Sequence, residues 1–382
     1  MIYLDNSATT RPRSEVTEAV RNAMEEGWFN PSSVYRPSMD VQKGMEDVRK
    51  ACLAAVHARN GKVIFTSGGT EADNLALMGS LKRTRKTGKI LLFSLDHPAV
   101  LACAEEMTRM GHQVLRIPCD ARGIADLAKL EEMMDPEVLL ISVMQVNNEV
   151  GSVQPLNRIM ELKKKLCPDA WVHVDGVQGF LRCPIDFDRL GIDSYAFSGH
   201  KIHALKGTGA LVLGKDAKVA PLLYGGGQEG DLRSGTENTV GITALGAAIG
   251  AWNPECVETM RALKKRLWNG IRERIPEAVL NGPDPEGEDA APHILNVSFQ
   301  PVRSQTMLFA LEGDGIYVSA GSACASRKQK ISPVLKAMNV STARADSALR
   351  FSLSPFTTEG DIDCAVQKLG EHYDELKKYV RR

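Results

Sequence analysis

Residues 194–201 read SYAFSGHK, a short apolar run that ends in serine and is followed by glycine, histidine and lysine. Similar apolar runs recur before and after it, and helical patterns separate most of them. They lie at 63–66, 90–94, 114–118, 138–143, 171–175 and 210–213. Short strands that alternate with helices predict a mostly parallel sheet of seven strands, sandwiched by helices. Ligands of such sheets bind beyond the carboxyl ends of the strands.

The pattern changes after about residue 250. Before that point we expect helices at 14–26, 38–57, 70–82, 97–110, 124–134 and 156–166. After it, a long amphipathic helix at 255–274 and a loop at 281–289 precede three strand-like segments and three helices. These are 295–299, 316–319 and 349–353, and 304–312, 332–338 and 358–380. We expect a large domain at 14–250 and a smaller α/β domain made of 1–13 and 251–382.

The composition excludes several classes of protein. Lysine and arginine number 47 among 382 residues, and aspartate and glutamate also number 47. A chain without a basic excess is not expected to bind nucleic acid directly. The chain starts without a basic segment and long apolar run, and no stretch is long enough to span a bilayer. We therefore expect a cytoplasmic protein that has no membrane partner.

Eight cysteines are scattered along the chain, and none forms a C-x-x-C pair. This spacing argues against a structural zinc site and is typical of reduced thiols. Cys52 falls on an apolar helical stripe with Met45 and Val56, which predicts a small buried side chain.

A glycine pair lies between the first predicted strand and the next helix. Gly68 and Gly69 allow a tight turn whose amides can face an anion, and Thr70 adds a hydroxyl where the helix dipole favours phosphate. A plain capped turn, with Thr70 as the N-cap, explains the same residues. Asp175 ends a predicted strand, where its carboxylate can pair with a cationic ring nitrogen or a metal, or can cap a following helix.

Two further side chains are candidates for covalent chemistry. Lys201 follows an apolar strand, and a lysine held partly out of water has a lowered pKa and can form a Schiff base. A surface lysine in a turn is the alternative. Cys324 lies among small residues and precedes a basic run, and nearby cations favour the thiolate. A small cysteine packed in a tight turn is the alternative there.

Two other patterns are weaker. Residues 225–230 match G-x-G-x-x-G, but the flanking strand and helix that a dinucleotide site needs are missing from the pattern. His200 and His203 would indicate a metal only with a third ligand, and none is in register. A phosphate cradle, a carboxylate and a lysine on one α/β scaffold instead describe a site for pyridoxal 5′-phosphate, which needs all three.

On these residues the chain resembles the cysteine desulfurases, fold-type I pyridoxal-phosphate enzymes of the class V aminotransferase group. The matching segments span nearly the whole chain and are 3–10, 30–33, 66–71, 97–100, 146–151, 198–201, 233–236 and 350–352. Residues 321–324 are similar to the branch with a long mobile cysteine loop. That branch supplies sulfur for iron–sulfur cluster assembly and tRNA thiolation.

The resemblance implies roles for the catalytic residues. Lys201 would carry the cofactor, and Cys324 would take the sulfur of L-cysteine. His97 would stack on the cofactor ring and move protons, and Asn148 and Arg350 would hold the substrate carboxylate. No resident metal is implied, although Cys324 could be a transient ligand of an iron–sulfur cluster.

The resemblance also implies the contacts of the cofactor. Asp175 would pair with the ring nitrogen and Gln178 with the ring hydroxyl, while Thr236 would reach the phosphate from a partner subunit. The whole implied set is Gly69, Thr70, His97, Asn148, Asp175, Gln178, Ser198, His200, Lys201 and Thr236. A homodimer follows, together with an acceptor protein for the sulfur in iron–sulfur assembly or tRNA thiolation.

Other activities remain open at this point. A selenocysteine lyase, an aminotransferase or a kynureninase-like lyase would share the fold and the cofactor. Cys324 favours the desulfurase over transamination, which needs no thiol. A sulfur-relay or scaffold protein with vestigial cofactor binding and a nicotinamide dehydrogenase belong to other classes; intact catalytic residues argue against the first, and only residues 225–230 support the second.

Overall fold

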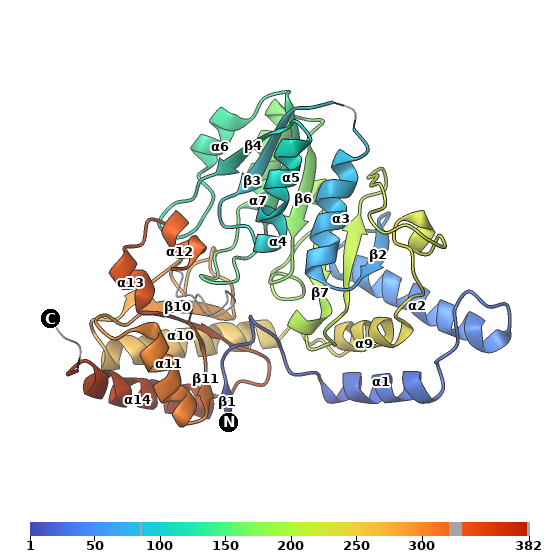
Figure 1. The fold of residues 1–382 in the computed structure, drawn as a ribbon. Coiled ribbons are helices and arrows are strands. Elements are labelled where there is room, and N and C mark those ends of the chain that lie inside the picture. Colours follow the sequence, from blue (N-terminus) through green and yellow to red (C-terminus); the bar gives the residue numbers. More distant parts are fainter. Residues whose placement is uncertain (85, 321–330, 380–382) are drawn as a thin grey trace.

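The computed structural model describes residues 1–84, 86–320 and 331–379, and a seven-stranded sheet forms the centre of the larger part (Figure 1). Its order is β2-β8-β7-β6-β5-β3-β4. The strands are β2 (Lys62–Thr66), β3 (Lys89–Phe93), β4 (Gln113–Ile117), β5 (Val138–Met144), β6 (Trp171–Asp175), β7 (Ser194–Ser198) and β8 (Gly209–Leu213). Only β8 runs antiparallel to its neighbours in this sheet. The predicted mostly parallel sheet is confirmed.

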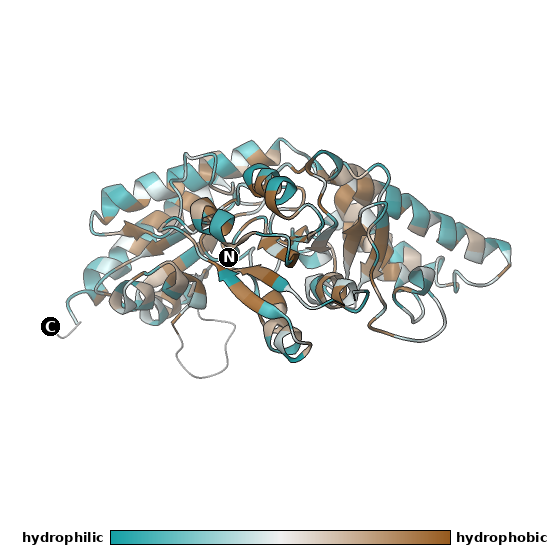
Figure 2. Cartoon of the chain, turned by 90° about the horizontal axis from the view of Figure 1, so that it is seen from above, coloured by the Kyte–Doolittle hydropathy of each residue, from teal (hydrophilic) through white to brown (hydrophobic). Residues whose placement is uncertain are grey.

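Helices cover both faces of this sheet because its strands are apolar on both sides. In β3, Ile90 and Leu92 pack in the cluster under α3 (Gly69–Leu81) and α5 (Cys103–Arg109), whereas Leu91 and Phe93 pack on the opposite face. Successive side chains of a strand point to opposite faces, so a fully apolar strand needs cover on both. The opposite face is covered by α2 (Arg36–Ala55), α6 (Leu127–Met133), α7 (Leu156–Leu166) and α9 (Thr239–Gly250). The cover leaves apolar strands inside and hydrophilic helix surfaces outside (Figure 2).

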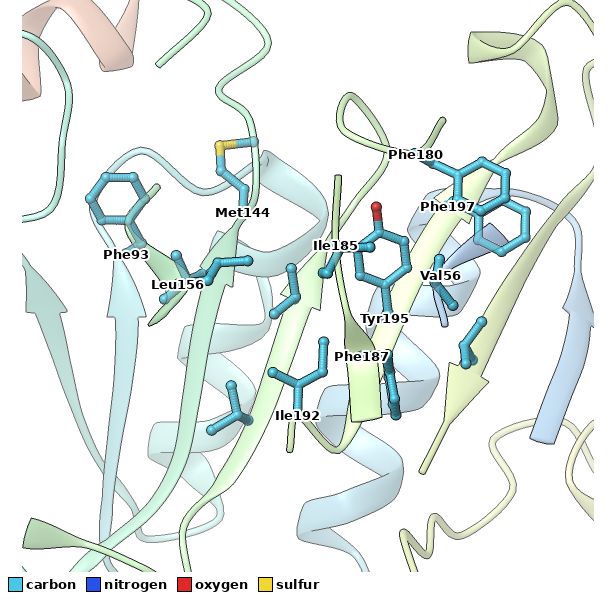
Figure 3. Packing of buried hydrophobic residues seen from close by; sticks show 14 of the residues in the cluster. Val56, Phe93, Met144, Leu156, Phe180, Ile185, Phe187, Ile192, Tyr195 and Phe197 are labelled. Atoms are coloured by element: carbon cyan, nitrogen blue, oxygen red, sulfur yellow. The ribbon is translucent and has the colours of Figure 1, made fainter. Parts of the chain in front are cut away.

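Aromatic packing fixes the turn that follows β6. The rings of Phe180 and Phe197 stack with centroids 3.9 Å apart, and Tyr195 lies beside them (Figure 3). The Tyr195 hydroxyl donates to Gln145 Oε1 at 2.7 Å. A Cβ on Gly176 would lie 1.9 Å from Cζ of Tyr195, so only glycine fits directly after the strand.

A second, antiparallel sheet of order β12-β13-β10-β9 lies in the C-terminal part. Its strands are β9 (Val279–Leu280), β10 (Ile294–Ser298), β12 (Ser319–Ala320) and β13 (Ala348–Ser352). Helices α10 (Cys256–Arg274), α11 (Ser304–Gly313) and α14 (Glu359–Leu376) share one apolar core with it, while α12 (Pro333–Ala337) and α13 (Thr342–Asp346) lie nearby. At the N-terminus, β1 (Ile2–Tyr3) pairs with β11 (Ile316–Tyr317), and Leu4 belongs to the same core. The division at residues 13 and 250 stays a prediction.

The helix expected at 14–26 is α1 (Ser14–Glu25), with Arg13 at its N-cap position. Some other local predictions were wrong. The helix expected at 97–110 consists of α4 (Pro98–Leu101) and α5, which meet at Ala102. The strand expected at 316–319 is split between β11 and β12, which belong to different sheets. Helix α9 was missed because it is apolar all round and lacks the one-sided pattern of a surface helix. In the described ranges, no helix is long and apolar enough to cross a bilayer.

A buried lysine makes a testable contribution to stability. Lys264 of α10 is 1% exposed, and its ammonium donates to the carbonyl of Ala291 at 2.5 Å. Burial lowers the pKa of Lys264 to about 8. The unfolded chain therefore binds this proton more tightly than the folded chain. The loss of folding stability caused by burying the charged lysine is full below about pH 8 and disappears as the pH rises toward 10.5.

We expect Lys264→Met to remove this pH dependence, because methionine has a similar length and no charge. Between pH 7.5 and 9.5, the wild-type protein should gain about 1–3 kcal/mol of unfolding free energy relative to the variant. Urea unfolding followed by tryptophan fluorescence measures the difference. Lys265→Met is the control, since the neighbouring Lys265 is half exposed and pairs with Glu286. Equal pH dependence in wild type and Lys264→Met would contradict the assignment.

Candidate active site

The ends of several strands bring the predicted site residues to one edge of the large sheet. Strands β2, β3, β5, β6 and β7 run in the same direction, so the residues after them lie along a common edge (Figure 1). These are Gly68–Thr70 after β2, His97 after β3, Asn148 after β5, Asp175 at the end of β6, and Ser198–Lys201 at the end of β7. This is the edge at which ligands of such sheets bind.

Lys201 is held by the N-terminal segment. It ends a short 3-10 helix (Gly199–Lys201), and its ammonium donates to the carbonyls of Ser7 and Ala8, the latter at 2.9 Å. The Ser7 carbonyl also accepts from Gln178 Nε2 at 3.0 Å. The Thr10 amide donates to the His200 carbonyl at 2.9 Å, so the segment follows the lysine's own loop. Two carbonyl oxygens thus fix the position of the amine.

Asp175 is a buried carboxylate at the end of β6. Among the described residues one hydrogen bond reaches it, from the Val177 amide to Oδ1 at 2.9 Å. Residues 176–182 form turns, so Asp175 caps no helix there. Burial and the nearby Asp73 raise the pKa of Asp175 to about 7, and His97 opposes the rise. A cationic group beside this carboxylate would stabilise its charged form.

A series of hydrogen-bonded side chains lies near Asp175 and was not predicted from the sequence. Trp171 Nε1 donates to the Ser194 hydroxyl at 3.1 Å, and that hydroxyl lies 2.9 Å from His173 Nδ1. His173 Nε2 lies 3.1 Å from Asp73 Oδ1. Burial lowers the pKa of His173 to about 4, so the ring is neutral. The period of two along β6, which puts His173 on the same face as Asp175, was the available signal.

His97 begins the short helix α4. Its Nδ1 accepts the Ala99 amide at 3.1 Å, so the neutral ring carries its proton on Nε2. His97 is exposed as a whole residue. Desolvation of its ring by the surrounding protein and the charge of Lys201 nevertheless lower the pKa of His97, while Asp175 opposes this shift. The preceding Asp96 is buried and accepts the Met144 amide at 2.8 Å, which fixes the loop that presents the ring.

The glycine pair forms a cradle at the start of α3. Gly68 has φ of 154°, a conformation that side chains rarely adopt, and it occupies the N-cap position. The alternative in which Thr70 is the N-cap is therefore wrong. A Cβ on Gly69 would lie 2.6 Å from Cγ2 of Val177, so the helix start packs tightly against the turn after Asp175. Thr70 is exposed in the first turn, and the buried Ser198 lies next to Gly69.

Thr236 belongs to a loop beside the cradle. It is exposed and lines a cavity of about 230 Å³ together with Ser67 and Thr208. Arg233 anchors the loop through an ion pair with Glu71 at 2.8 Å. The assignment of Thr236 to a partner's site stays a prediction.

Arg350 reaches the site from the smaller sheet. This β13 residue is largely buried; Nη2 donates to Asp5 Oδ1 at 2.7 Å and Nη1 to the Asn148 carbonyl at 2.9 Å. Its Nε is buried and has no partner in the described part of the chain. Asp5 lies in the matching segment 3–10, but it was not predicted as a site residue. The guanidinium therefore joins the N-terminal segment to the loop after β5.

The remaining predictions concern the cysteines, the glycine motif at 225–230 and metal binding. Cys324 lies outside the described residues. Burial raises the pKa of Cys52 to about 12, in agreement with its predicted structural role. Residues 225–230 follow no strand, and only a 3-10 turn (Glu229–Asp231) overlaps them, so the dinucleotide motif is not supported. Across the described ranges, no group of three His, Cys, Asp or Glu side chains is placed to hold a metal.

The donors at this edge fit pyridoxal 5′-phosphate. Asp175 is a buried carboxylate whose charged form a cation would stabilise, and the protonated ring nitrogen of the cofactor is such a cation. Lys201 is an amine at the same edge. The start of α3 and Ser198 offer amides and a hydroxyl to a phosphate.

Comparisons with known proteins agree with this geometry. Residues 2–364 match the family described as "Aminotransferase class-V". The chain is 34% identical over 380 residues to the cysteine desulfurase IscS of Dictyoglomus turgidum, covering 98% of this chain and 95% of that protein.

Solved structures are also similar. A NifS-like protein has a TM-score of 0.89 at 32% identity, covering 98% of this chain and 100% of its own. SspA, in a structure in complex with cysteine, has a TM-score of 0.80 at 28% identity, covering 94% of this chain and 100% of its own. The chain therefore belongs to the class-V aminotransferase family, as a pyridoxal-phosphate-dependent enzyme of its cysteine desulfurase group.

Proposed function

We propose that the residues at this sheet edge convert L-cysteine to L-alanine and pass its sulfur to Cys324 as a persulfide. The observation that carries the proposal is the convergence of Lys201, the buried Asp175 and the Gly68–Thr70 cradle, with Arg350 reaching the same edge. SspA, a structural relative, has been solved in complex with cysteine, which supports the choice of substrate.

Pyridoxal phosphate, when bound, supplies an electron sink for the substrate carbon that loses its proton. Lys201 is the residue that would hold its aldehyde, and Asp175 would keep its ring nitrogen protonated. Gln178 would donate to the ring hydroxyl, and the ring of His97 would lie against the cofactor. The phosphate contacts are Gly69, Thr70, Ser198 and His200, with Thr236 from the partner subunit.

Proton positions support these roles. Burial and the charges of Lys201 and Lys206 lower the pKa of His200 to about 4, so its neutral ring can donate one hydrogen bond. His97 has Nε2–H free to face the cofactor side, because Nδ1 is occupied by the Ala99 amide. For His97 to take up a proton, Nδ1 must release that amide, so proton movement is coupled to the start of α4.

The substrate carboxylate would bind Arg350 and the side chain of Asn148. Arg350 now pairs with Asp5, and a second carboxylate can share the guanidinium because Nη1 and Nη2 each carry a second N–H. Since Asn148 O already holds Nη1, the fork is fixed in place before substrate arrives.

The transfer of sulfur from L-cysteine to Cys324 needs no added oxidant. The Cys324 thiolate attacks the substrate sulfur; an S–S bond forms, the substrate C–S bond breaks, and its electron pair stays on carbon. A proton completes the methyl group of alanine, and the persulfide remains on Cys324. A sulfur acceptor of iron–sulfur assembly or tRNA thiolation would then take the terminal sulfur, in the cytoplasm.

We further propose a homodimer. Apolar side chains around the α1–α2 connection are exposed in the single chain, including Val34 at 92% and Trp28 at 66%. Trp28 and Phe29 stack with centroids 4.4 Å apart and form an ordered patch with Tyr35. A patch of this kind is typical of a protein interface.

Cys324→Ser tests the sulfur step. Serine stays protonated at neutral pH without an adjacent base, so the variant should bind the cofactor and L-cysteine but form neither alanine nor persulfide at a significant rate. The absorbance of the cofactor reports binding, and alanine is quantified directly. Cys364→Ser, at an exposed cysteine of α14, is the control and should keep full turnover. Near-normal alanine from Cys324→Ser would remove Cys324 from the mechanism and favour an ordinary lyase.

Arg350→Ala should weaken L-cysteine binding. Loss of a charge-assisted hydrogen-bonded pair costs about 1.5–3 kcal/mol, or roughly ten- to 150-fold in affinity. Titration of the cofactor spectrum in a Cys324→Ser background measures binding without turnover. Arg344→Ala is the control, because Arg344 instead bonds Asn281 and the Leu280 carbonyl. An unchanged affinity in folded Arg350→Ala would refute its role.

Mixed subunits test the shared site. Lys201→Ala and Thr236→Asp chains are each expected to be inactive, but a mixed dimer would keep one intact site if Thr236 acts across the interface. Random reassortment should restore about a quarter of wild-type activity, since half of the dimers are mixed and one of two sites works. Lys201→Ala mixed with Asp175→Ala should restore none, because both residues come from one chain. No recovery in the first mixture would show that Thr236 does not serve a partner's site.

A further inference from the structure

A group of basic side chains near Lys201 forms no ion pair with a carboxylate of the described ranges. We call it the basic cluster and define it as Arg13, Arg182 and His203, together with the indole of Trp252. Arg182 follows the turn after β6, and its Nη2 donates to the carbonyl of Lys201. The Arg13 amide donates to the His203 carbonyl at 3.1 Å, which ties the cluster to the N-terminal segment.

Arg182 is the central charge of the cluster. It is 2% exposed, and both Nε and Nη1 are buried without a hydrogen-bond partner. Burial lowers the pKa of Arg182 to about 10, so the group is still charged at neutral pH. The acidic groups that act on it are the thiols of Cys183 and Cys256, and no carboxylate of the described ranges pairs with it.

Trp252 brings a second guanidinium to the same place. The Cζ atoms of Arg182 and Arg13 lie 5.8 Å and 5.9 Å from the centroid of its ring. Trp252 Nε1 and Arg13 Nε are also buried without a partner. Four donor nitrogens belong to these three side chains, and none has a hydrogen-bond partner within the described protein.

His203 is a neutral ring beside the two arginines. Its Nδ1 donates to the Arg11 carbonyl at 2.8 Å, so Nε2 is an acceptor in the neutral ring, and it too is buried without a partner. Burial, followed by the charges of Arg182 and Arg13, lowers the pKa of His203 to about 4. The ring stands edge-on to Phe356, with centroids 5.1 Å apart, so an aromatic side chain lies beside it.

A buried charge and several unpaired N–H groups are costly to leave as they are. Ordered water would satisfy the N–H groups but would leave the guanidinium charge without a counterion. An anion would do both. A site beside the rings of Trp252 and His203 favours a weakly hydrated monovalent anion over sulfate or phosphate, because these oxyanions are more strongly hydrated and lose more hydration energy on burial.

We propose that the basic cluster binds a small inorganic anion of the halide class, with Arg182 and Trp252 as its main donors. The anion would lie next to the loop that carries Lys201, because Arg182 holds the Lys201 carbonyl. Its binding would stabilise the folded state, since the unfolded chain offers no such site.

Thermal unfolding of the pyridoxal-phosphate-loaded protein tests the proposal. The bound cofactor keeps anions out of the phosphate cradle. At constant ionic strength, replacing potassium gluconate by potassium bromide should raise Tm in a saturable way. Arg182→Gln should weaken the bromide dependence at least about tenfold, the usual effect of losing a charge-assisted bond. Arg266→Gln, at an exposed arginine paired with Asp363, should keep the wild-type response.

Two further results decide the outcome if Arg182→Gln folds poorly. Trp252→Phe keeps an aromatic six-membered ring but loses the pyrrole ring with its Nε1–H, so it should fold and bind bromide more weakly. Crystals of the wild type grown in bromide should show an anomalous peak in contact with Arg182 and Trp252. A Tm that is equal in gluconate and bromide, or crystals with water alone at the cluster, would overturn the proposal.

Discussion

The common direction of the strands in the large sheet is the constraint on which the site depends. Strand β8 alone reverses, so the carboxyl ends of β3, β5, β6 and β7 lie together with that of β2. A loop after any of these strands reaches the same edge, whatever its distance along the chain. The register of the strands is fixed because both faces of the sheet are buried under helices, so a slip would move apolar side chains out of their packing.

The N-terminal segment couples that edge to the smaller sheet. It starts as strand β1 beside β11, and Leu4 is buried in the C-terminal core. Asp5 then pairs with Arg350, and the Ser7 and Ala8 carbonyls hold Lys201. A few residues thus connect the predicted substrate-binding arginine to the predicted cofactor lysine.

Buried acidic and basic groups lie at different places around the site. The carboxyls of Asp73, Asp96 and Asp175 are buried, and burial raises the pKa of each. Arg182 donates to the Lys201 carbonyl, and no carboxylate of the described ranges pairs with it. Buried groups of one sign are costly unless something of the opposite sign is bound. A cationic ring beside Asp175 and an anion beside Arg182 would each compensate a buried group of the opposite charge.

The sequence by itself determined the elements and most of the candidate site. Apolar runs and helical patterns placed the seven strands, and the glycine pair, Asp175 and Lys201 were recognised from their positions at strand ends. Helix α9 was missed because an element that is apolar all round has no periodic signal. Only the tertiary structure decided the pairs between distant residues, such as Asp5 with Arg350 and Asp73 with His173. Their charges and protonation depend on burial, which is a property of the packed molecule and of no local stretch of chain.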